Sequence, residues 1–274
     1  MRLRISHSTT YRYEPPASGV IQILRVTPRS HDGQYIANWQ IDVSTDSRLD
    51  ARQDAFGNIT HVLTHGTLTD LTVHVEGTVE THDTGGVLKG TDERFPPSLF
   101  LRTTPLTEVS TDMTSFARNL YMESDGDQLG FLHTLLGQIH DHMTFDVQPT
   151  DSATTARQAF ELRRGVCQDY AHIFIGCARS TGIPARYVSG HLLRADGMVV
   201  QDAGHAWAEA YIQNLGWVGF DAANAISTTD AHVRVAIGLD YLGAAPVRGT
   251  RYGGGYETLS VAVTVDQAGR QSQS

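Results

Sequence analysis

The stretch RRGVCQDYAHIFIGC, Arg163–Cys177, contains both cysteines of the 274-residue chain. Gly165 allows the chain to turn, and the apolar residues that follow recur at helical spacing: Tyr170, Ile173, Phe174 and Cys177. The segment STGIP, with Gly182 and Pro184, marks the end of this helix. The spacing therefore predicts a helix whose first turn contains Cys167.

A thiol in the first turn of a helix faces the positive end of the helix dipole, which favours the nucleophilic thiolate. The free backbone N–H groups of that turn can also bind a developing oxyanion. The commoner role of a cysteine is that of a small apolar core residue, and we assign this role to Cys177. About 15 Å of helix separates Cys177 from Cys167, which is too far for a disulfide.

A nucleophilic cysteine needs a base and a group that orients the base. Residues 204–224, GHAWAEAYIQNLGWVGFDAAN, form two strand-like segments around the turn QNLG, and we expect them to pair as a hairpin. His205 begins the first strand and Asp221 ends the second, so the two should lie side by side. Alone, His205 would be interpreted as a structural histidine. With Asp221 on one ring nitrogen and Cys167 on the other, it becomes a candidate base.

Three segments in this order resemble the core of the transglutaminase-like superfamily of papain-like thiol enzymes. They are GVCQDYAHIFIGCARSTGIPARYVSGHL, GHAWAEAYI and GWVGFDAAN. The resemblance implies that Cys167 is the nucleophile, His205 the base and Asp221 the orienting carboxylate. The chain is especially similar to bacterial members that carry an extra β-rich N-terminal domain, and residues 232–263 resemble their C-terminal segment.

The sequence departs from the family pattern in two places. The aspartate segment commonly continues with Pro-Thr-Asn, whereas this chain has FDAAN, with Ala222 and Ala223. Animal crosslinking enzymes have a tryptophan upstream of the cysteine that helps to bind the oxyanion, and residues 142–165 contain none. A backbone donor or the side chain of Gln168 would have to make that second contact.

The chain changes character after its first hundred residues. These residues form short strand-like segments with turn signals, such as the Gly-Asn turn of residues 54–65, and indicate a β-sandwich-like module. Amphipathic helices are predicted within residues 106–122 and 127–143. Residues 152–165 indicate a short helix with a Ser or Thr cap and a glycine stop. The segments after the cysteine helix again resemble strands.

We therefore predict an α+β protein in which a transglutaminase core of papain-like fold follows an N-terminal β-sandwich-like domain. The predicted N-terminal domain spans residues 1–90, and a linker spans 91–108. The core with its C-terminal strand spans 109–266, and a flexible tail spans 267–274.

Composition narrows the set of partners and the compartment. A net charge of −9 disfavours nucleic acid. No apolar run approaches the roughly 18 residues of a membrane span, and the start of the chain lacks the apolar block of a secretory signal. We therefore expect a cytoplasmic protein with no membrane partner. Two cysteines are too few for a disulfide framework.

Histidines suggest a metal site at two places, His140–Met143 (HDHM) and the pair His61 and His65. No cysteine or carboxylate completes either set with known ligand spacing, so neither a metal nor a cofactor is expected. Asp169 and Glu209 flank the candidate catalytic positions. We expect them to be solvated or ion-paired carboxylates rather than groups that tune catalysis.

The expected reaction is acyl transfer through a thioester, on a peptide or protein amide substrate. Cys167 attacks a carboxamide carbonyl, either of a peptide bond or of a glutamine side chain, and His205 protonates the leaving amine. Water then gives hydrolysis, whereas an amine gives transamidation. Hydrolysis is favoured because nothing in the chain marks an amine site. A non-catalytic binding module of the same fold is the alternative, and the presence of all three residues argues against it.

Overall fold

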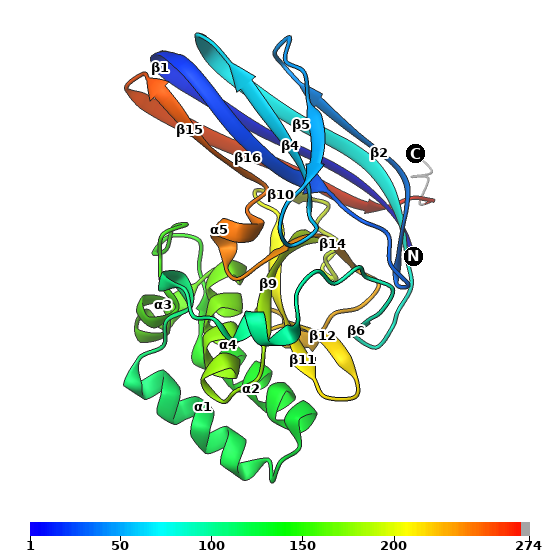
Figure 1. Ribbon diagram of the computed structural model, residues 1–274, viewed down its shortest axis with the longest axis vertical. Coiled ribbons are helices and arrows are strands. Elements are labelled where there is room, and N and C mark those ends of the chain that lie inside the picture. Colours follow the sequence, from blue (N-terminus) through cyan, green and yellow to red (C-terminus); the bar gives the residue numbers. More distant parts are fainter. Residues whose placement is uncertain (270–274) are drawn as a thin grey trace.

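The computed structural model describes residues 1–269. Figure 1 shows a large twisted sheet above a second part in which helices cover a smaller sheet. The large sheet has eight strands. They are β1 (Arg2–Thr27), β2 (Gln34–Val43), β3 (Asp50–Gln53), β4 (Ile59–His65), β5 (Leu68–Thr81), β10 (Val200–Gln201), β15 (Val247–Gly253) and β16 (Tyr256–Gln267).

The long strand β1 runs through both halves of the large sheet. Its first half pairs antiparallel with β5 and β16, and its second half pairs with β4 and β15. Apolar side chains from both regions meet in one buried cluster that includes Leu24, Val26, Val73 and Val75. By hydrogen bonding, β1 joins these strands into one sheet, and its two halves with their partner strands pack against each other through this cluster.

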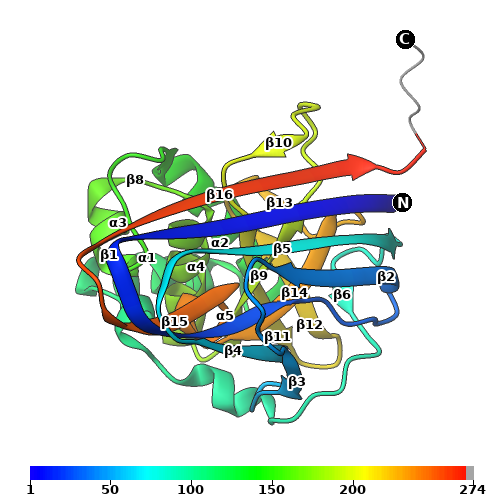
Figure 2. The ribbon, with the colours of Figure 1, turned by 90° about the horizontal axis from the view of Figure 1, so that it is seen from above.

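The last two strands of the chain belong to this same N-terminal sheet. β16 pairs with β1 from Leu3 opposite Gln267 to Glu14 opposite Tyr256, and Figure 2 shows the two strands running side by side. The predicted division counted the strand that ends at residue 266 with the core, whereas its hydrogen bonds are made to β1. Of the predicted tail, residues 270–274 lie outside the described part of the chain.

The smaller sheet has six strands and carries the candidate site. Its path is β13 (Ile226–Ser227), β12 (Gly216–Asp221), β11 (His205–Ile212), β9 (Ala185–Leu192) and β14 (His232–Gly238), with β6 (Val87–Leu88) on β12. The parallel pair β7 (Thr144–Phe145) and β8 (Arg164–Gly165) stands apart.

Within residues 1–269, five α-helices accompany this sheet: α1 (Thr111–Glu123), α2 (Gln128–His142), α3 (Ala156–Leu162), α4 (Cys167–Ser180) and α5 (Tyr241–Ala244). Helices α1 and α2 confirm the two predicted amphipathic helices. The predicted linker contains two short 3-10 helices, η1 (Pro97–Leu101) and η2 (Pro105–Thr107). None of the helices within residues 1–269 is long and apolar enough to span a membrane.

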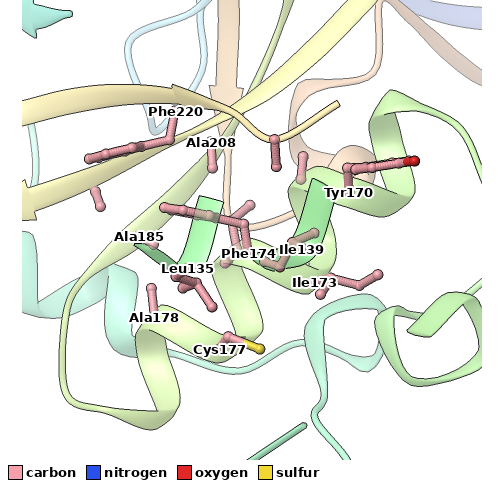
Figure 3. Close-up of a cluster of buried hydrophobic side chains, with 14 of the residues drawn as sticks. Leu135, Ile139, Tyr170, Ile173, Phe174, Cys177, Ala178, Ala185, Ala208 and Phe220 are labelled. Atoms are coloured by element: carbon pink, nitrogen blue, oxygen red, sulfur yellow. The ribbon is translucent and has the colours of Figure 1, made fainter. Parts of the chain in front are cut away.

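Helix α4 lies at the centre of the core. Figure 3 shows Phe174 and Cys177 of this helix among side chains from α2 and from the small sheet. Cys177 is fully buried, and burial raises the pKa of its thiol to about 12. The interpretation of Cys177 as a core residue is therefore confirmed.

A buried ion-pair network holds the small sheet to the segment before the helices. Arg186 is fully buried, with Nε 2.6 Å from Glu209 and Nη1 2.6 Å from Glu93. Its guanidinium carbon lies 3.8 Å from the ring centroid of Trp217. Arg234 places its Nε 2.7 Å from the other oxygen of Glu209. Strands β9, β11 and β14 are thus joined through one carboxylate, and the ion-paired interpretation of Glu209 is confirmed.

Removing this carboxylate should destabilise the protein strongly. Glu209→Ala leaves two guanidiniums without their shared partner, and we expect the free energy of unfolding to fall by about 3–5 kcal/mol. The matched control is Asp50→Ala, because Asp50 pairs with Arg48 at the surface and exposed pairs contribute about 0–1 kcal/mol. Urea denaturation at pH 7 measures both. Equal losses would contradict a stabilising role for the network.

Candidate active site

Cys167 is the first residue of α4, as the sequence predicts. The side chain of Asp169 fixes this end of the helix, because its Oδ2 accepts the backbone N–H of Val166 at 2.8 Å and the hydroxyl of Thr150 at 2.8 Å. Asp169 is 1% exposed, and burial raises the pKa of its carboxyl although these hydrogen bonds oppose the shift. The expectation of a solvated or ion-paired Asp169 was wrong, because this carboxylate caps the helix that carries Cys167.

The approach to Cys167 depends on two backbone positions. A Cβ at Gly165 would lie 2.5 Å from Oδ2 of Asp169, so only glycine allows this close packing. The second position is Arg163, which ends helix α3 in the left-handed backbone conformation, with φ of 56°. The Thr155 cap of α3 confirms the predicted Ser or Thr cap. The predicted glycine stop was wrong, because Arg163 itself adopts the left-handed conformation.

The predicted hairpin brings the next two residues together. Strands β11 and β12 pair antiparallel, with Ala208 opposite Phe220, and the turn between them has Asn214 at φ 69°. His205 and Asp221 consequently lie at the same end of the hairpin, and Nε2 of His205 is 2.6 Å from Oδ2 of Asp221. The predicted juxtaposition of these two side chains is confirmed.

The charges at this pair favour a protonated ring. Burial lowers the pKa of His205, but the charge and hydrogen bond of Asp221, together with the nearby Cys167 thiol, outweigh it and raise the pKa to about 10. Burial alone would raise the pKa of Asp221, but the charge of His205 keeps it well below its usual range. With Nε2 bound to Asp221, Nδ1 is the ring nitrogen left for another partner.

Two further residues hold Asp221: Asn224, the last residue of the FDAAN segment, and His232, which the sequence analysis did not identify. Nε2 of His232 is 3.1 Å from Oδ2 of Asp221, and Nδ2 of Asn224 is 2.7 Å from the same oxygen. The backbone N–H of Thr229 donates to Nδ1 of His232 at 3.1 Å. Since Nδ1 accepts, Nε2 carries the proton and donates to the carboxylate. Asp221 therefore receives hydrogen bonds from two histidines.

Within residues 1–269, one group of three side chains has donor atoms close enough for a metal: His205, Asp221 and His232, within 4.8 Å of one another. Both histidines are hydrogen-bonded to Asp221 through Nε2, so these donor atoms already have partners. The HDHM histidines make other contacts. His140 lies 3.3 Å from the carbonyl of Ala222, and His142 lies 3.1 Å from a carbonyl of α3.

Cys167 and His205 open onto a cavity of about 220 Å³ between the core and the N-terminal sheet. Within the described residues, the backbone N–H groups of Cys167 and Gln168 have no acceptor. The side-chain amide of Gln168 reaches toward the carbonyl of Asp151, at 3.5 Å. The free donors beside the thiol are thus backbone groups of the first helical turn.

Comparison with known proteins agrees with this architecture. Residues 114–222 match the transglutaminase-like superfamily, and residues 3–80 match the bacterial transglutaminase-like N-terminal region. An uncharacterised protein of Mycobacterium leprae (strain TN) is 28% identical over 283 residues, covering 96% of this chain and 98% of that protein. An uncharacterised protein of Mycobacterium tuberculosis H37Rv is 29% identical over 291 residues, covering 97% and 92%.

Among solved structures, the fold is similar to that of a proposed cysteine protease from Cytophaga hutchinsonii. The TM-score is 0.78 at 21% identity, and the superposition covers 99% of this chain and 92% of that one. The sequence matches and the shared fold lead to one assignment. The chain belongs to the transglutaminase-like superfamily, with a bacterial transglutaminase-like N-terminal region in front of the core.

Proposed function

We propose that this protein is a thiol-dependent acyl-transfer enzyme that hydrolyses a peptide or amide bond through a thioester on Cys167. The observation that carries the proposal is the placement of His205. One ring nitrogen is bound by Asp221 at 2.6 Å, and the ring lines the same cavity as Cys167. A thiol beside an imidazole that a carboxylate orients is the arrangement that nucleophilic catalysis requires.

In the acylation step, the sulfur of Cys167 attacks the carbonyl carbon and the proton of the thiol resides on His205. The oxyanion forms beside the backbone N–H groups of Cys167 and Gln168, which have no other acceptor within the described residues. When the intermediate collapses, the C–N bond breaks and His205 gives its proton to the departing amine. The product is a thioester between the acyl group and Cys167.

In the second step, water attacks the thioester and His205 accepts a proton from it. The C–S bond breaks, the acid product leaves, and Cys167 regains its proton. An amine in place of water would give transamidation by the same steps. Hydrolysis is the proposed outcome because water reaches the open cavity in front of Cys167 and no group in this part of the chain marks an amine site.

The direct test is to trap the acyl-enzyme from a cell extract and to identify the attached fragment by mass spectrometry. The fragment should be found on Cys167, and Cys167→Ala should abolish it without changing the circular dichroism spectrum. Adding amines to the trapped species then separates hydrolysis from transamidation.

Iodoacetamide should modify Cys167 much faster than the buried Cys177. Peptide mapping that shows the reverse order would contradict the assignment.

Asp221→Asn should lower the pKa of the His205 ring. In the native protein this pKa is raised to about 10, so the ring should remain protonated from pH 6 to pH 9. The ion pair between the protonated ring and Asp221 stabilises the fold fully below the pKa of histidine in the unfolded chain, near 6.5. This stabilisation is lost as the pH rises through about 10. Without the carboxylate charge, burial dominates and the ring should titrate at or below about 6.5. NMR of ¹⁵N-histidine protein measures this, and a native ring that titrates below 6.5 would contradict the ion pair.

His232→Leu should slow the reaction through Asp221. It removes one donor from a buried carboxylate, and hydrogen bonds to charged groups contribute about 1.5–3 kcal/mol, or about 10–100-fold in rate. His232→Gln keeps an N–H donor and should recover most of the rate. The measurement is the rate of Cys167 alkylation by iodoacetamide, with thermal unfolding recorded for each variant. Equal alkylation rates for His232→Leu and His232→Gln would limit His232 to a structural role.

A further inference from the structure

The cavity in front of Cys167 is closed on one side by a different part of the protein. Cys167 and His205 lie on the core side, and strands β1, β15 and β16 of the N-terminal sheet form the opposite side. In Figure 1 this sheet lies across the end of the core at which α5 and β9 are found. A substrate bound to Cys167 would therefore contact both parts of the chain.

The wall that the N-terminal sheet contributes is mostly apolar. It includes the side chains of Tyr11, Val26, Val247, Leu259 and Val261. Leu259 is 56% exposed although it is a large apolar residue. The register that places Leu259 opposite Tyr11 sets both residues on neighbouring strands beside the cavity. These side chains have apolar surface available for a ligand.

The ionisable groups that line the cavity are neutral or paired. Burial lowers the pKa of His7 to about 4 and of His191 to about 3, so both rings are uncharged at neutral pH. Arg25 is paired with Asp54, with Nε 3.0 Å from Oδ2. Among the described residues, no Asp, Glu or Lys lines the cavity. A charged side chain entering it would lose hydration without gaining an unpaired counter-ion.

The cavity is also large enough for a ring. Its volume is about 220 Å³, whereas an engineered apolar cavity of about 150 Å³ in another protein holds benzene. Burying such a side chain completely contributes about 1.5–3 kcal/mol. A substrate with such a side chain should therefore bind or react roughly 10–100-fold better than a substrate with a methyl group at that position.

We propose that this cavity is the subsite for the acyl-donor side chain, that it selects an uncharged apolar or aromatic residue, and that the N-terminal sheet sets this selectivity. The inference rests on the proposed function, because it assumes that Cys167 is acylated. Under it, Leu259 and its neighbours on β16 are specificity-determining residues, although they lie far from Cys167 in the sequence. The N-terminal sheet is then a part of the substrate site.

Acetylated single-residue chloromethyl ketones test the proposal, with Phe, Ala, Glu or Arg as the residue. Each alkylates Cys167 with loss of chloride, and each rate is divided by the iodoacetamide rate of the same variant. In the native protein the Phe probe should react at least tenfold faster than the Ala, Glu and Arg probes. Leu259→Glu should reduce the Phe preference severalfold and increase the rate of the Arg probe.

Ser260→Glu is the matched control, because it adds the same charge at the next residue of β16, which does not line the cavity. It should leave the probe ratios unchanged. Equal ratios for all four probes, or ratios unaffected by Leu259→Glu, would overturn the subsite proposal. Preference for the Glu probe would also overturn it and would indicate Arg25, whose Nη1 has no partner among the described residues. Failure of iodoacetamide to modify Cys167 would instead reject the proposed function.

Discussion

The carboxylate of Asp221 has no exposed surface, and the geometry of the site depends on how its charge is balanced. Its Oδ2 accepts hydrogen bonds from His205, His232 and Asn224. A buried carboxylate without such donors would take up a proton or destabilise the fold. The three donors keep it ionised, and the ionised form holds the ring of His205 in one orientation. The position of the proposed base thus follows from the need to satisfy one buried charge.

A second buried carboxylate lies on the same hairpin and is balanced differently. Glu209 is paired with Arg186 and Arg234, and guanidiniums keep their protons at any physiological pH. The ion pairs of Glu209 can therefore hold strands together but cannot take part in proton transfer. Asp221 is paired with His205, an imidazole that can transfer its proton when a neighbouring charge changes. The choice of partner, arginine or histidine, separates a structural ion pair from one that can take part in proton transfer.

The sequence predicted the parts of the site that local rules determine. Helical spacing placed Cys167 at the start of a helix, and the QNLG turn placed His205 beside Asp221 because a short hairpin fixes its own register. His232 could not be predicted, because β14 reaches this end of the sheet only by pairing with β9, which is a non-local event. The same applies to β16. Its alternating valines fit either sheet, and only pairing with β1 decides between them.

The pairing of β1 with β16 also bears on how the protein is made. The ribosome delivers β1 well before β16, so one edge of the first half of β1 has unsatisfied backbone groups until β16 emerges. Such an edge can pair with other chains. Leu259 and Val261 arrive only with β16, after Cys167, His205 and Asp221 have emerged. The three proposed catalytic residues are therefore synthesised before the strand that completes the wall of the proposed subsite.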